Sequence, residues 1–105
     1  MQFKDYLASF PDISSLAGID VLDEKGEVIH HIPAIEGKLG SLKLYNALLE
    51  QFDHQLNEEA AQQGLIWFAE HVDDAKQNAG KHPNIDLLFK VLEHHYQWQL
   101  KALHK

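Results

Sequence analysis

The residue types best suited to proton transfer gather in the segment 67–74. On one continuous helix the spacing i, i+3, i+4 and i+7 would place three of them and a tryptophan on a single face. These are Trp67, Glu70, His71 and Asp74. A carboxylate can orient an imidazole for general acid or base catalysis, so Glu70 and His71 are the candidate catalytic residues. The alternative interpretation is a polar helix face whose tryptophan lies at the margin of the core.

A second candidate site is the loop at residues 80–84, a glycine-containing segment that runs into an expected helix. Free backbone N–H groups at a helix N-terminus, the helix dipole and a lysine together favour an anion. Lys81, His82 and Asn84 are therefore candidate ligand-binding residues for a small anion. Residues 37–41, Gly-Lys-Leu-Gly-Ser, repeat the pattern before an earlier helix. A helix stop followed by an N-cap explains either loop without a ligand.

Histidine is frequent, with eight residues in the chain, and two pairs are adjacent: His30-His31 and His94-His95. Neighbouring side chains point to opposite faces of a strand and diverge by about 100° on a helix, so neither pair chelates a metal by itself. The absence of cysteine excludes disulfides, iron–sulfur clusters and thiolate zinc sites. We therefore assign no metal ligand and expect no cofactor, and a histidine–carboxylate metal site is an alternative that requires distant residues to converge.

Charge and composition exclude further classes of protein. The chain has 16 acidic and 9 basic residues, a formal net charge of -7, and every basic residue is lysine. An acidic chain repels a polyanion, and without arginine it lacks the bidentate donor that recognises phosphate and guanine, so we expect no nucleic-acid partner. No signal-like N-terminus and no run of about 18 apolar residues is present, so we expect a cytoplasmic protein without a membrane partner.

The elements that must position these residues can be read from the hydrophobic pattern. With 105 residues, of which 45% are hydrophobic, we expect one domain over residues 1–105. Residues 3–10 predict a short opening helix. Two β-prone runs within residues 19–32 flank Gly26, which can supply the positive φ of a tight loop, and predict a β-hairpin. Residues 54–56 could add a third strand.

Three longer helices follow from caps and apolar spacing. The first runs from Ser41 to about Phe52, and the second from Asn57 to Gly80 with acidic residues in its first turn. The third begins at Asn84 and continues almost to the last residue. The predicted fold class is α+β, a β-hairpin or small antiparallel sheet packed against three main helices plus a short N-terminal helix.

The end of the third helix carries apolar side chains in a segment that we expect to extend past the core. An exposed apolar patch usually marks a partner surface. The candidate interface residues are Tyr96, Trp98, Leu100 and Leu103. They predict a homodimer, whereas packing back onto the same domain is the alternative.

Several short sequence motifs occur together in this chain. They are Asp20-Val21-Leu22-Asp23 with Gly26, Tyr45-Asn46-Ala47-Leu48, Phe68-Ala69-Glu70-His71 and, above all, Gly80-Lys81-His82-Pro83-Asn84-Ile85-Asp86. In these motifs the chain, up to about Leu92, resembles a family of small uncharacterised bacterial proteins, domain of unknown function 2322. The resemblance implies no catalytic or binding residues.

These observations support three hypotheses about function. The first is a non-enzymatic binding or interaction module that self-associates, because no catalytic motif has its expected spacing while apolar helical surface is plentiful. The second is a small enzyme or anionic-metabolite-binding protein with its site near the Gly80–Asn84 loop, where His71 would be a general base and Lys81 would hold the anion. The third is a metal-binding protein. Convergence of Glu70, His71 and His82 in one pocket would favour the second.

Overall fold

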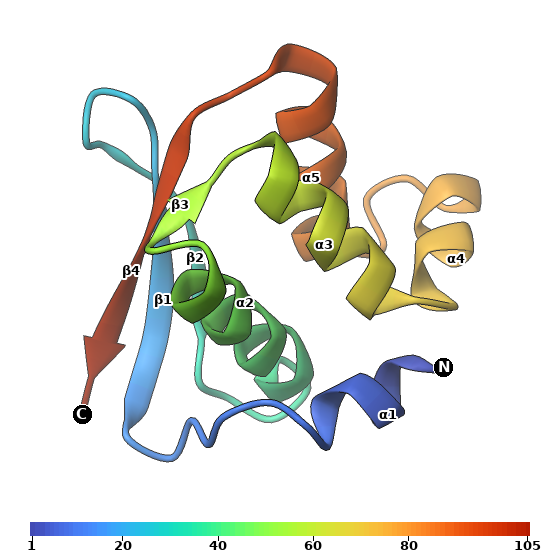
Figure 1. Cartoon of the computed structure of the whole chain (residues 1–105), viewed down its shortest axis with the longest axis horizontal. Coiled ribbons are helices and arrows are strands. Elements are labelled where there is room, and N and C mark those ends of the chain that lie inside the picture. Colours follow the sequence, from blue (N-terminus) through green and yellow to red (C-terminus); the bar gives the residue numbers. More distant parts are fainter.

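The computed structural model describes all 105 residues and has the predicted α+β fold, with five helices and a four-stranded antiparallel sheet (Figure 1). The elements, in chain order, are α1 (Phe3–Leu7), β1 (Leu16–Leu22), β2 (Val28–Pro33), α2 (Leu39–Gln51), β3 (Gln55–Leu56), α3 (Glu58–Phe68), α4 (His71–Gln77), α5 (Pro83–His94) and β4 (Trp98–His104). Figure 1 shows the helices on one side of the sheet, with α2 nearest to the strands. None of the helices has the length and apolar character needed to cross a membrane.

The sheet has the strand order β2-β1-β4-β3. Strands β1 and β2 form the predicted hairpin, which turns at Gly26 with a φ of 82°. The Asp23 carboxylate closes the turn by accepting the N–H groups of Lys25 and Glu27, each at 2.9 Å. The predicted third strand is also present, as the short edge strand β3. The interior position beside β1 is taken by β4, from the other end of the chain.

The expectation of a helix running almost to the last residue is wrong. Helix α5 ends at His94, because His95 takes left-handed backbone angles (φ 57°, ψ 40°) and the chain returns as β4. Trp98 and Leu100 are only 7% and 2% exposed and belong to the core. The apolar surface on which the homodimer prediction depended is therefore largely buried inside the chain, and Tyr96 and Leu103 are half-buried beside it.

Helix α2 forms the centre of the fold and contacts all four strands. Its N-cap is Lys38 rather than the expected Ser41, and its buried side chains include Leu42, Tyr45 and Leu48. Helices α3 and α5 cross close together above α2, because α3 places a glycine at the contact. A Cβ at Gly64 would lie 2.7 Å from a methyl carbon of Leu88. This packing fixes the N-termini of α2 and α5 relative to each other.

The expected single helix from Asn57 to Gly80 is divided in two. Its start is as predicted, because the Asn57 side chain accepts the N–H of Ala60 at 3.1 Å. It breaks at Ala69, whose backbone angles (φ 52°, ψ -117°) lie outside the helical region, and α4 begins at His71. The predicted continuous face through residues 67, 70, 71 and 74 does not exist, because the chain turns between its members.

The strain at Ala69 gives a testable prediction. A positive φ in this region costs a residue with a Cβ about 1–3 kcal/mol, whereas glycine adopts it freely. We expect Ala69→Gly to raise the free energy of unfolding by about 1 kcal/mol, since the added chain entropy of glycine offsets part of the relief. Urea denaturation of the variant measures the change.

The matched control is Ala79→Gly, in the exposed loop between α4 and α5, where the backbone φ is not positive. We expect this control to lower stability slightly, because glycine only adds freedom to the unfolded chain there. Equal losses in both variants would contradict the strain assigned to Ala69.

Candidate anion-binding site

The two Gly-Lys loops that the sequence places far apart meet at one cavity of about 210 Å³. Gly37, Lys38 and Ser41 line it from the start of α2. The 80–84 loop and the start of α5 line it from the other side, with contributions from Lys81, His82, Pro83, Asn84 and Ile85. All three predicted ligand-binding residues, Lys81, His82 and Asn84, therefore lie at the same cavity.

Backbone donors without acceptors lie at the two helix starts beside this cavity, and two of the residues that carry them, Ser41 and Asn84, line it. The first N–H groups of any helix have no intrahelical partner. At α2 these are the N–H groups of Leu39, Gly40 and Ser41, and at α5 the N–H of Asn84, none of which has an acceptor in the chain. Both helices lack a side-chain cap. Helices of 13 and 12 residues thus direct the positive ends of their dipoles to one place.

Asn84 forms a rigid floor for the cavity and is only 6% exposed. Its carbonyl oxygen accepts the hydroxyl of Tyr45 from the core, and its Oδ1 accepts Nε2 of His30 from β2 at 2.7 Å. Burial of the Tyr45 side chain raises the pKa of its hydroxyl, which remains a donor. The Asn84 Nδ2 group has no partner in the chain, although no fully enclosed side-chain polar atom is unsatisfied. Since Asn84 lines the cavity, Nδ2 is an accessible donor on a side chain that His30 holds in place.

Two lysines supply positive charge at the cavity. Lys38 has no carboxylate within 4.0 Å, so its ammonium group is unpaired. Lys81 Nζ lies 3.1 Å from Asp74 Oδ2, and His82 Nε2 lies 2.6 Å from the same oxygen. The hydrogen bond from His82, with a further one from Lys81, lowers the pKa of Asp74 to about 2. The ionised carboxylate of Asp74 thus offsets part of the charge of Lys81.

An aromatic wall, formed by Phe3, Phe68 and His71, lines another side of the cavity. The Phe3 ring of α1 stacks on Phe68 at a centroid distance of 5.4 Å and meets the edge of His71 at 5.0 Å. The His71 imidazole has no hydrogen-bond partner in the chain and lies 5.9 Å from the His82 ring. The break at Ala69 is what allows the last residue of α3 and the first residue of α4 to line one cavity.

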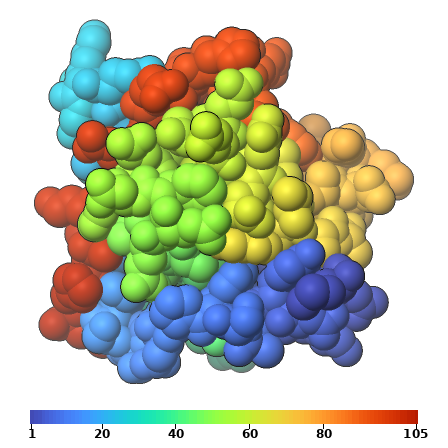
Figure 2. All heavy atoms as spheres, in the orientation of Figure 1, coloured from blue at the N-terminus to red at the C-terminus, as the bar shows by residue number.

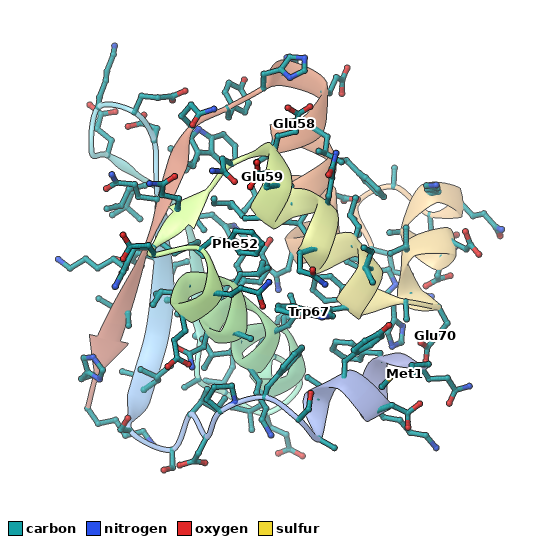
Figure 3. All side chains as sticks on the ribbon, viewed as in Figure 1. Met1, Phe52, Glu58, Glu59, Trp67 and Glu70 are labelled. Carbon is teal, nitrogen blue, oxygen red and sulfur yellow. The ribbon has the colours of Figure 1, made fainter.

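Glu70 does not join His71 at this site. Its Oε1 accepts the backbone N–H of Phe3 at 2.8 Å, and this hydrogen bond is the main cause of its lowered pKa. Figure 3 shows Glu70 beside the N-terminal helix. Of the predicted catalytic pair, only His71 lines the cavity, and Glu70 holds α1 in place.

The other histidines do not converge on a metal site. No group of three or more histidine, aspartate or glutamate side chains is arranged to hold a metal ion. His31 pairs with Asp20 at 2.7 Å on the open face of the sheet, and His95 lies 3.3 Å from Glu58. The metal-binding hypothesis therefore has no site to support it.

Fold and cavity together define a small α+β protein with two uncapped helix N-termini at a shared, lysine-bearing pocket. The model of a family described as uncharacterized proteins conserved in bacteria (DUF2322) matches residues 3–102, so the chain belongs to this family. This match confirms the family resemblance inferred from the short sequence motifs. No curated protein and no solved structure matches the chain.

Sequence reasoning missed several residues of the cavity. Lys38 and Ser41 belong to the 37–41 loop, which repeats the pattern of the 80–84 loop, and the repeated Gly-Lys before a helix is the sequence signal that points to them. Phe3 and Phe68 carried no signal beyond helical spacing, because core-facing and cavity-facing aromatic residues look alike in a sequence.

The lowered pKa of Asp74 predicts a pH dependence of stability. A carboxyl whose pKa falls from 3.8 in the unfolded chain to about 2 in the folded one stabilises the fold above the higher value, and that contribution disappears as pH falls through the lower one. Asp74→Asn should therefore melt at a lower temperature than wild type by a constant amount above about pH 5, and the difference should shrink below pH 4.

Asp73→Asn is the control, because Asp73 is the adjacent residue of α4, is exposed and makes no ion pair. Melting curves by circular dichroism between pH 2 and 7 measure both variants. A difference between wild type and Asp74→Asn that persists unchanged at pH 2 would refute the assigned ion pairs.

Proposed function

We propose that this protein binds a small anionic ligand in the cavity between the N-termini of α2 and α5. The observation that carries the proposal is the meeting of the 37–41 and 80–84 loops at one cavity. Either loop alone is explained as a helix start. Two uncapped helix N-termini, each preceded by a lysine, form a concentration of donors and positive charge that suits an anion.

The balance of charge at the cavity favours a negative ligand even though the whole chain is acidic. Lys38 and Lys81 contribute two positive charges, and Asp74 contributes one negative charge on the outer side of Lys81. The helix dipoles add the equivalent of about half a charge at each N-terminus. A ligand with one or two negative charges would neutralise this local excess.

The size of the cavity limits the ligand. Its volume is about 210 Å³. Pockets for drug-sized molecules occupy about 300–1,000 Å³. The site therefore suits a small metabolite or an inorganic oxyanion.

Binding is proposed rather than catalysis, because the expected pair of Glu70 and His71 is not formed. The self-association hypothesis loses its main support, since Trp98 and Leu100 are core residues. No separate observation favours a second function.

Calorimetric titration with inorganic phosphate tests the proposal at constant ionic strength, with sodium chloride as the balancing salt. We expect a saturable signal with one site per chain. Sulfate and phosphate also stabilise proteins by exclusion from their surface, but that effect rises with concentration and does not saturate. A melting temperature that rises linearly with phosphate, with no calorimetric saturation, would overturn the proposal.

A further inference from the structure

We infer that the ligand is a phosphate monoester of a small organic group, with its phosphate at the N-termini of α2 and α5 and its organic group against the ring of Phe3, which stacks on the buried Phe68. The inference rests on the proposed function and specifies the chemical class of the ligand. It also assigns Phe3 as the residue that selects for the organic group.

The arrangement of donors favours a tetrahedral oxyanion over a carboxylate. Free backbone donors line the cavity from two separate segments, Ser41 at the start of α2 and Asn84 at the start of α5. A phosphate monoester presents three terminal oxygens in different directions, whereas a carboxylate presents two oxygens in one plane. Two lysines on opposite loops also match the double negative charge of such a group.

An independent observation at Asn84 points to a ligand. Asn84 is only 6% exposed, and its Nδ2 has no acceptor in the chain. Nδ2 is accessible rather than enclosed, and His30 prevents the side chain from turning away because it holds Oδ1. A ligand oxygen in the cavity would satisfy this donor.

The aromatic wall accounts for the organic group. Phe3 is half-buried and belongs to α1, a five-residue helix with no buried residue of its own. Its ring is held by the stack on Phe68 and by the hydrogen bond from its N–H to Glu70. Figure 2 shows the N-terminal residues lying against the segment that contains α3. Phe68 is only 3% exposed, so Phe3 is the ring that an inorganic ion would leave uncovered and that an ester group would cover.

The test compares inorganic phosphate, phenyl phosphate and benzoate by calorimetric titration. Wild-type protein should bind phenyl phosphate about tenfold more tightly than inorganic phosphate, since a good aromatic contact is worth about one factor of ten in affinity. Benzoate has the same ring but carries a planar carboxylate with a single negative charge. It should therefore bind more weakly than phenyl phosphate by about tenfold or more.

Variants of Phe3 and Phe10 test where the ring of phenyl phosphate binds. Phe3→Ala should remove the tenfold preference for phenyl phosphate over inorganic phosphate, measured as the ratio of the two Kd values in the same variant. Phe3→Leu keeps an apolar side chain and serves if the alanine variant is unfolded, and it should lose most of the preference. Phe10→Ala is the matched control, because Phe10 packs on Trp67 outside the cavity, and it should keep the full preference.

The outcomes separate the inference from the proposed function. If wild type does not bind inorganic phosphate, the proposed function fails. If it binds phosphate but shows no preference for phenyl phosphate, or binds benzoate as tightly, only the ligand class is overturned. A preference that survives in both Phe3 variants would overturn the role of Phe3.

Discussion

Replacing Lys38 with alanine is expected to weaken the binding of inorganic phosphate by about 10- to 100-fold, because a charge-assisted contact contributes about 1.5–3 kcal/mol. Lys81→Ala should have a smaller effect, since Asp74 already neutralises part of that lysine's charge. For the same reason Asp74→Asn should tighten binding. Calorimetric titration of the three variants gives this order directly.

Lys90→Ala is the control for net charge. Lys90 lies on α5, is exposed and does not line the cavity, and its loss changes the net charge of the chain by the same amount as the loss of Lys38. We expect its Kd for phosphate to stay within about twofold of wild type at physiological salt, where distant surface charges are screened. Equal losses of affinity in the Lys90 and Lys38 variants would show that net charge, not the cavity, governs binding.

Removing β4 by ending the chain at Glu93 is expected to abolish folding. This strand occupies an interior position of the sheet between β1 and β3 and buries Trp98 and Leu100. The milder variant Leu100→Ala should lower the free energy of unfolding by about 2–5 kcal/mol, the usual cost of emptying a leucine site in a core. That is a large part of the about 5–15 kcal/mol that stabilises a typical domain.

Lys101→Ala is the matched control on the same strand, because its side chain is exposed. We expect it to change stability by less than about 0.5 kcal/mol. Circular dichroism and sedimentation velocity distinguish the outcomes. A truncated chain that remains folded and becomes monomeric, from a full-length dimer, would contradict the core role of β4 and restore the self-association hypothesis.

The hairpin could be predicted from the sequence because its signals are local. β-prone residues on both sides of Asp23-Glu24-Lys25-Gly26 define the two strands, and Gly26 supplies the positive φ of the turn. The N-cap at Asn57 was equally local, since an asparagine before two glutamates suits a helix start. In both cases the residues that decide the structure lie within a few positions of each other.

The C-terminal strand could not be predicted in this way, because residues 96–103 fit two patterns. Tyr96, Leu100 and Leu103 have helical spacing, while Trp98, Leu100 and Ala102 alternate with polar residues as in a strand. The choice depends on β1, which lies about eighty residues away and offers an unpaired edge. Tertiary pairing of this kind overrides local spacing.

The sequence predicts each of the two loops of the candidate site, but it does not predict that they meet at one cavity. The 80–84 loop was recognised from its own composition, but nothing in it indicates that the 37–41 loop lies opposite. Their convergence follows from the close crossing of helices at Gly64, which is a property of packing. The break at Ala69 was also unpredictable, because alanine is the strongest helix former and gives no local stop signal.

The central claim is that an anion binds at the N-termini of α2 and α5, and a phosphate titration followed by ¹H–¹⁵N NMR tests it most directly. The account predicts that the largest shifts occur, with one common saturation curve, at the backbone amides of Leu39, Gly40, Ser41 and Asn84 and at the Asn84 side-chain amide. Changes that do not saturate, or that are largest near exposed lysines such as Lys90 and Lys101, would contradict it.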